Sequence, residues 1–153
     1  GGGAFPLYRP NIDTRPGPTV DLVANFNEPL PIEGAQFDGL LSKYSAEHVS
    51  WRKVDAFFAE CARILKPGGV AVFVLPNLLE QCRHFVEVGD AGGDLSRWVC
   101  AIFGDQDYGE NAHCVGWSPS SICIALRKAG FASVIVTPFG EFLTDMIVEA
   151  RRA

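Results

Sequence analysis

The stretch "RILKPGGVAVFVLP", Arg63 to Pro76, predicts the end of a helix, a reversal of the chain and a buried strand. Pro67 cannot continue a helix, and Gly68 and Gly69 give the backbone the freedom to turn back. The run that follows is apolar almost throughout, whereas a strand with one wet face would alternate with polar residues. We therefore expect a strand of a parallel sheet with helices over both faces.

The residues before this stretch predict a strand followed by an amphipathic helix. Apolar side chains recur at helical spacing from Trp51 to Leu65, and Ser50 stands where an N-cap accepts hydrogen bonds from free N–H groups. Phe37 to Tyr44 predicts the preceding strand, and two shorter extended segments lie in "RPNID" and in Val20 to Asn25. Strand, helix and strand in this order form a βαβ unit.

The residues after Pro76 predict further helices and a final pair of strands. A short amphipathic pattern runs from Leu95 to Phe103, and a second helix has Ser118 as its cap, Pro119 at its first position and Gly130 at its end. The segments "ASVIVTPF" and "TDMIVEARR" are close enough to pair antiparallel. We expect an α/β fold of one domain over residues 1–153, with a Rossmann-like, doubly wound, mostly parallel sheet and a C-terminal antiparallel hairpin.

Composition excludes several classes of partner. The net charge is -5, and basic residues are scattered, which argues against a nucleic-acid backbone or an anionic membrane as ligand. Five cysteines without C-x-x-C spacing predict neither a disulfide framework nor a zinc knuckle, so a reducing cytoplasm is expected. No apolar run approaches the roughly 20 residues that span a bilayer. A small-molecule ligand fits this composition best.

Candidate ligand-binding residues lie just after the predicted strands, because such sheets bind ligands beyond the carboxyl ends of their strands. Asp13 stands where a carboxylate accepts both hydroxyls of an adenosine ribose, although Thr14 and Pro16 beside it also suit a simple turn. The triplet Gly1 to Gly3 lacks the G-x-G-x-x-G spacing of a pyrophosphate loop. The other candidates at this rim are Asn25, Phe26, Ser42 to His48, Pro76 and Asn77.

One family resemblance covers nearly the whole chain. The motifs "FD", "EH" and "RILKPGG" follow one another in the order seen in class I S-adenosylmethionine-dependent methyltransferases, and "AGFASVIVTPF" is similar to that family's final hairpin. The small bacterial and phage-type branch resembles the chain most. The first strand of the family has no counterpart in the chain, and "GGGAF" resembles the loop that follows it.

The resemblance implies S-adenosyl-L-methionine as cofactor and assigns it a set of residues. Arg63 to Gly69 would be structural. The triplet Gly1, Gly2 and Gly3 would approach the methionine moiety, and Asp13 would hold the ribose. Asn25 and Phe26 would border the adenine. Ser42 and Lys43 would lie beside the cofactor.

Two histidines are the candidates for a catalytic base. His48 lies in "AEHV", where packing or capping is the alternative role, and His113 lies in a long polar loop that could equally be only solvated. Cys114 follows His113, but it has no second pair of ligands, so the sequence predicts no metal site. Of the three tryptophans, Trp51, Trp98 and Trp117, two are expected in the core and one is left to stack on a planar acceptor.

Three functions therefore stay open. The first is a methyltransferase that acts on a small polar acceptor, such as a metabolite, a sugar or a nucleotide-linked compound. The second is a degenerate member of the fold that binds the cofactor, or nothing, and serves as a scaffold. The third is a different nucleotide-binding α/β protein, which the absence of a pyrophosphate fingerprint disfavours. A homo-oligomer, in which a neighbouring chain covers the open centre of the sheet, is compatible with each.

Overall fold

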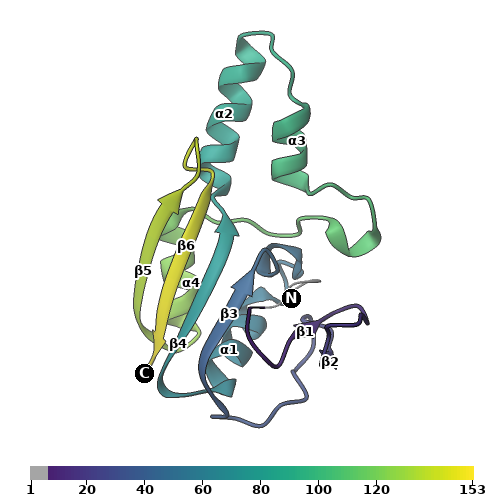
Figure 1. Ribbon diagram of the computed structural model, residues 1–153. Coiled ribbons are helices and arrows are strands. Elements are labelled where there is room, and N and C mark those ends of the chain that lie inside the picture. Colours follow the sequence, from purple (N-terminus) through teal and green to yellow (C-terminus); the bar gives the residue numbers. More distant parts are fainter. Residues whose placement is uncertain (1–6) are drawn as a thin grey trace.

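The computed structural model describes residues 7–153, which form two sheets, helices and connecting loops (Figure 1). The elements are, in chain order, β1 (Ile12–Asp13), β2 (Leu22–Val23), β3 (Phe37–Lys43), the 3₁₀ turn η1 (Ala46–His48), α1 (Val54–Ile64), β4 (Leu65–Pro76), α2 (Leu78–Asp90), α3 (Ser96–Phe103), η2 (Gly109–Asn111), α4 (Pro119–Lys128), β5 (Phe131–Phe139) and β6 (Asp145–Arg152).

The larger sheet has the strand order β3-β4-β6-β5. β3 and β4 pair in parallel through the α1 crossover, which confirms the predicted βαβ unit. β6 enters between β4 and β5 and runs antiparallel to both, so the predicted C-terminal hairpin is also confirmed. β1 and β2 form a separate parallel pair beside β3.

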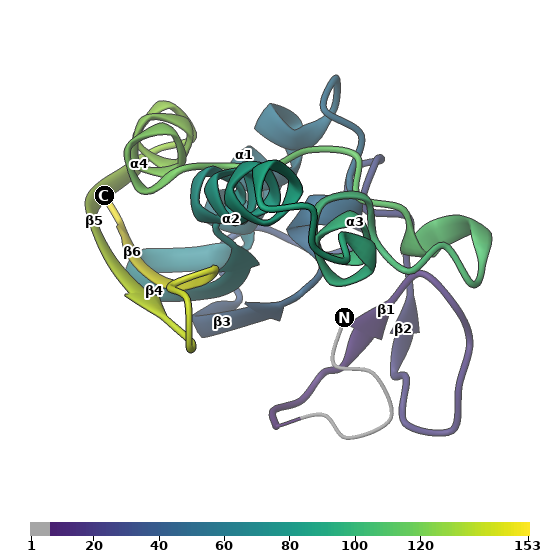
Figure 2. The ribbon, with the colours of Figure 1, turned by 90° about the horizontal axis from the view of Figure 1, so that it is seen from above.

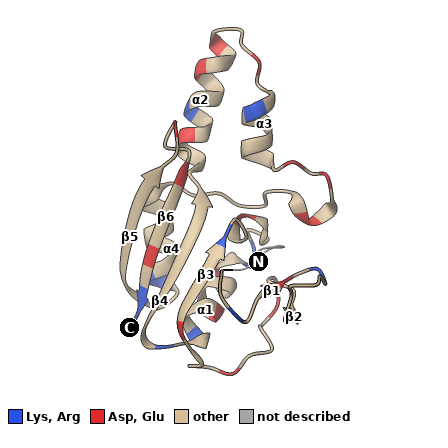
Figure 3. Ribbon diagram, in the orientation of Figure 1, with Lys and Arg blue, Asp and Glu red and all other residues tan. Residues whose placement is uncertain are grey.

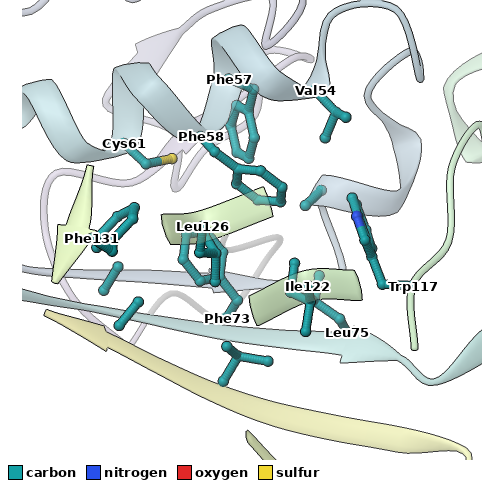
Figure 4. Close-up of a cluster of buried hydrophobic side chains, with 14 of the residues drawn as sticks. Val54, Phe57, Phe58, Cys61, Phe73, Leu75, Trp117, Ile122, Leu126 and Phe131 are labelled. Atoms are coloured by element: carbon teal, nitrogen blue, oxygen red, sulfur yellow. The ribbon is translucent and has the colours of Figure 1, made fainter. Parts of the chain in front are cut away.

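α1 and α4 pack on one face of the larger sheet and enclose the main core. Phe58 of α1 is fully buried, and its ring lies edge-on to that of Phe73 of β4, with 5.4 Å between the ring centroids. Ile122 and Leu126 of α4 are buried in the same cluster, and Trp117 packs on Phe58 at 5.5 Å between centroids (Figure 4). This layer holds the carboxyl ends of β3 and β4 in fixed positions.

The opposite face of the sheet is not covered by helices within residues 7–153, in contrast to the prediction (Figure 2). Along β4, Ala71, Phe73 and Leu75 are buried beneath the helices, whereas Val70 and Val72 alternate with them and are only half-buried. The strand therefore has two unequal faces. The difference in burial between the two faces could not be predicted from the sequence, because both faces carry apolar side chains.

The stretch from Arg63 to Pro76 joins α1 directly to β4. The helix ends at Ile64 and the strand begins at Leu65, so Pro67 does not end the helix as expected but lies inside the strand. Gly68 has φ of 78°, in the left-handed region. At Gly69 a Cβ atom would lie 2.9 Å from the Lys66 carbonyl oxygen and 3.1 Å from the Asp38 carbonyl oxygen, so only glycine fits without a shift.

The two predicted helix caps have different outcomes. Ser118 caps α4 as expected, since its Oγ accepts the Ser121 N–H and the Ser121 hydroxyl accepts the Ser118 N–H. Ser50 does not cap α1, because residues 51–53 form a turn before the helix begins at Val54. Its Oγ accepts the Arg52 N–H within that turn.

α2 and α3 extend past the carboxyl end of β4 as an antiparallel pair (Figure 1). Asn77, buried to 1% exposure, fixes their base: its Nδ2 donates to the Leu143 carbonyl oxygen over 2.9 Å, and its backbone N–H donates to Thr144. These contacts give Asn77 a structural role, and its place at the ligand rim stays a prediction. No helix in the described part of the chain has the length and apolar character needed to cross a bilayer.

Candidate functional site

A largely apolar cavity of about 410 Å³ lies between the free edge of β3 and the segment that leads into β1. Phe26, Ser42 and Lys43, three of the predicted cofactor residues, line it together. Phe26 is held by α1, since its ring packs on that of Phe57 with 5.6 Å between centroids. The volume lies in the range of small-molecule sites.

Ser42 gives this cavity a polar group that lacks a protein partner. Its side chain is 6% exposed, and its Oγ has no hydrogen-bond partner in the described structure. A buried hydroxyl without a partner costs free energy unless a ligand or water satisfies it. The cavity therefore fits a mostly apolar ligand that offers a hydrogen bond near Ser42.

The other predicted cofactor residues lie outside this lining. Asp13 and Asn25 are at the carboxyl ends of β1 and β2, and each makes a local turn: Asp13 Oδ1 accepts the Arg15 N–H over 3.2 Å, and Asn25 Oδ1 accepts the Asn27 N–H over 3.0 Å. Gly1, Gly2 and Gly3 lie outside the described residues.

A second cavity, of about 460 Å³, is lined in part by the segment that follows β3. Tyr44, Glu47 and His48 reach it from that segment, and its other walls come from α2, α3, the loop before α4 and the start of β6. His113 and Asp145 are among the lining residues. The structure thus brings together both predicted catalytic histidines, which are far apart in the sequence.

Glu47 is a member of this site that was expected only as part of the rim segment Ser42 to His48, with no role of its own. It is 2% exposed, and its Oε2 has no hydrogen-bond partner among residues 7–153. Burial is the main reason why the pKa of its carboxyl rises to about 7, and the nearby Asp145 raises it further. In the sequence, the pair "EH" serves only as a family motif. An acidic residue directly before a candidate base was the feature that could have indicated a role for Glu47 in the site.

The two histidines meet in the lining of the cavity. Their ring centroids are 5.1 Å apart in an edge-on arrangement, and the backbone N–H of Cys114 donates to the Glu47 carbonyl oxygen over 2.7 Å, which pins the His113 loop to η1. His48 Nδ1 lies 3.1 Å from the Ala112 carbonyl oxygen. Burial, and then His48, lower the pKa of His113, so the His113 ring is neutral near pH 7.

Tyr44 and Asp145 add a second polar pair to the same cavity. Burial and the hydrogen-bonded Asp145 raise the pKa of Tyr44 to about 12, and burial raises the pKa of Asp145. The tyrosine is therefore a hydrogen-bond donor throughout the physiological pH range.

An aromatic cluster closes the side of the second cavity that faces α3. Trp98 is 6% exposed and stacks on His84, with 5.0 Å between ring centroids. Trp117 is also buried, and Trp51 is exposed beside Arg52, so two of the three tryptophans are in the core as predicted. Figure 3 marks acidic residues along α2 and basic residues near the C-terminal end of β6.

The chain is similar to known methyltransferases in sequence and in fold. A model of the methyltransferase domain matches residues 10–73, which run from the segment before β1 into β4. The chain is 44% identical over 59 residues to the uncharacterized protein YafE of Escherichia coli, covering 39% of this chain and 24% of that protein. It is 29% identical over 114 residues to the ubiquinone biosynthesis O-methyltransferase of Chelativorans sp., covering 74% of this chain and 41% of that enzyme.

Solved methyltransferase structures share the fold. An S-adenosylmethionine-dependent methyltransferase of Thermotoga maritima, described as a possible histamine N-methyltransferase, has a TM-score of 0.58 at 18% identity, covering 88% of this chain and 65% of that one. The 1,6-didemethyltoxoflavin-N1-methyltransferase of Burkholderia thailandensis, with bound substrate and S-adenosylhomocysteine, has a TM-score of 0.59 at 14% identity, covering 93% and 60%.

These findings place the chain among the methyltransferase-fold α/β proteins. More narrowly, residues 10–73 resemble a methyltransferase domain, and the solved structures that share the fold include S-adenosylmethionine-dependent methyltransferases. The chain spans about a quarter and two fifths of the length of the two curated relatives.

Proposed function

We propose that the protein transfers a methyl group from S-adenosylmethionine to a small polar acceptor. One observation carries this proposal: the segment from Ser42 to His48 lines both cavities, with Ser42 and Lys43 on the first and Tyr44, Glu47 and His48 on the second. A donor on one side and an acceptor on the other would meet across this short segment. In-line transfer needs this alignment more than it needs a general base.

The first cavity fits the cofactor in its chemistry. Phe26 offers an aromatic surface to a base, and the unpartnered Ser42 hydroxyl offers a hydrogen bond. We propose that Asp13 binds the ribose hydroxyls and that Asn25 borders the adenine, with Gly1 to Gly3 near the methionine moiety. The bound cofactor supplies an electrophilic methyl group.

The residues of the second cavity would hold the acceptor and take up its proton. An acceptor hydroxyl or amine loses that proton as its lone pair forms the new bond to carbon. His113, neutral near pH 7, and His48 are the proposed acceptors of the proton. The O-methyltransferase among the relatives favours a hydroxyl over an amine.

We expect a small molecule rather than nucleic acid as the acceptor. The free state of all five cysteines supports the cytoplasm as the proposed location.

A cofactor-binding protein without catalysis is the second candidate. It is favoured by Asn25, whose side-chain oxygen is already used in a turn with Asn27 and is therefore less available to the adenine. The two candidates agree on cofactor binding and differ in turnover.

The test compares Asp13→Ala with Asp38→Ala, which removes an exposed carboxylate paired with Lys66 at the far end of β3. We expect the first variant to weaken S-adenosylhomocysteine binding at least about tenfold, as for loss of a charged hydrogen bond, and the second to leave it unchanged. Equal affinities in both variants would contradict the ribose assignment. Formation of S-adenosylhomocysteine from S-adenosylmethionine in the presence of a panel of phenols, sugars and amines separates an enzyme from a binding protein.

A further inference from the structure

Glu47, His48 and His113 come together more closely than a shared cavity requires. One ligand atom from each side chain, a carboxylate oxygen or a ring nitrogen, lies within 4.8 Å of the others. We propose that these three side chains bind a divalent transition-metal ion in the lining of the second cavity. Two imidazoles and one carboxylate are a donor set used by proteins for zinc and for non-haem iron.

The carboxylate of Glu47 is the strongest argument. It is nearly inaccessible to solvent, yet its Oε2 finds no hydrogen-bond partner in the described structure. Its backbone is fixed, since η1 begins one residue earlier and the Glu47 carbonyl oxygen accepts the Cys114 N–H over 2.7 Å. An isolated buried carboxylate is costly, whereas a coordinated cation satisfies its oxygen and its charge together.

The two histidines are oriented as metal ligands are. A carbonyl oxygen only accepts hydrogen bonds, so the 3.1 Å contact to Ala112 requires the hydrogen of His48 on Nδ1 and leaves the lone pair on Nε2. The backbone at Ala101 and Ile102 also interacts with the His113 ring. Histidines that bind metals usually donate their second nitrogen to a backbone carbonyl or a carboxylate, which fixes the ring.

The donor set also selects the ion and leaves it open to a ligand. Imidazole nitrogens favour zinc, cobalt or iron over magnesium, which prefers oxygen ligands. Three protein ligands leave at least one position for water or for an oxygen atom of a molecule in the second cavity. If the proposed function holds, that oxygen belongs to the acceptor. With the ion bound, the histidines are its ligands, and the proton-accepting role proposed for them above passes to solvent.

Metal binding is tested on the protein after removal of metal with EDTA, in a background in which the exposed Cys82, Cys100 and Cys114 are changed to serine. This background removes thiolates that bind zinc adventitiously. Calorimetry with Zn²⁺ is expected to give one site per chain. Co²⁺ should give visible absorption from the same site, and Mg²⁺ should bind much more weakly.

Glu47→Gln and His113→Ala are expected to weaken Zn²⁺ binding at least about tenfold. The control is His84→Ala, which removes a histidine that stacks on Trp98 outside the cluster and should leave the affinity unchanged. A second measurement needs no variant of the site: Zn²⁺ should protect His48 and His113, but not His84, from modification by diethyl pyrocarbonate.

Absence of stoichiometric Zn²⁺ binding, an equal loss in His84→Ala, or unprotected histidines would each refute the metal site. S-adenosylhomocysteine binding, measured on the same samples, is a separate readout. Zn²⁺ binding without binding of S-adenosylhomocysteine would support the metal site and contradict the proposed function. Binding of S-adenosylhomocysteine without Zn²⁺ binding would support the proposed function and contradict the metal site.

Discussion

The substitution Asn77→Asp tests how the structure holds the second cavity in place. The two side chains have the same shape, but aspartate replaces the amide donor with an acceptor. In the native protein Asn77 Nδ2 donates to the Leu143 carbonyl oxygen over 2.9 Å at a site that is 1% exposed. The carboxylate would face that carbonyl oxygen without a donor between them and would be buried.

The expected cost at pH 7 combines the loss of this hydrogen bond with the burial of an unpaired charge, together about 2–4 kcal/mol. For a chain of 153 residues, 1 kcal/mol shifts the melting temperature by about 2–4 °C. Thermal unfolding followed by circular dichroism should therefore show a decrease of about 5–15 °C. The decrease should shrink at low pH, because a protonated carboxyl can donate to Leu143 again.

The matched control is Gln36→Glu. Gln36 Nε2 also donates to a backbone carbonyl oxygen, that of Gly34 over 3.2 Å, but this side chain is exposed. We expect a change of less than about 0.5 kcal/mol there. Equal melting temperatures for Asn77→Asp and the wild type at pH 7, or equal effects of the two variants, would refute the role given to burial at Asn77.

Three further outcomes follow from the same structure. Phe58→Ala should lower the free energy of unfolding in urea by about 3–5 kcal/mol, because it empties the centre of the core, while Phe103→Ala, at an exposed position, should change it little. Gly69→Ala should cost about 1–3 kcal/mol in the same assay, because its Cβ would meet the Lys66 carbonyl oxygen; a neutral result would contradict the close approach. Burial raises the pKa of the Cys61 thiol to about 12, so at pH 8 this thiol should react with Ellman's reagent only after unfolding. Its reactivity should rise as the pH approaches that pKa. Equally fast reaction of all five cysteine thiols at pH 8 would contradict this expectation.

The order of elements could be predicted because it depends on local patterns. Phe57, Phe58 and Cys61 recur at helical spacing, and the run from Val70 to Leu75 has a strong strand preference, so α1 and β4 were expected. The cap at Ser118 depends on residues within one turn, and it forms as expected. The end of α1 was misplaced, because the pairing of Phe37 with Leu65 draws Leu65 into the sheet.

The candidate site could be predicted only in part, because it depends on contacts between distant residues. His48 and His113 were selected for their chemistry, but nothing in the sequence shows that the Cys114 N–H binds the Glu47 carbonyl oxygen and brings their rings together. For the same reason Glu47 was expected only as part of the rim segment Ser42 to His48, with no role of its own. Its importance comes from its burial beside those rings, and an acidic residue in a polar segment does not indicate burial.

The most direct test of the account is a calorimetric titration of the chain with S-adenosylhomocysteine, with NAD as the control ligand. The resemblance to methyltransferases and the paired cavities predict saturable binding of S-adenosylhomocysteine at one site per chain, with no heat of binding from NAD. Binding of NAD, or no binding of S-adenosylhomocysteine by folded protein, would contradict the claim that the first cavity is a methyl-donor site.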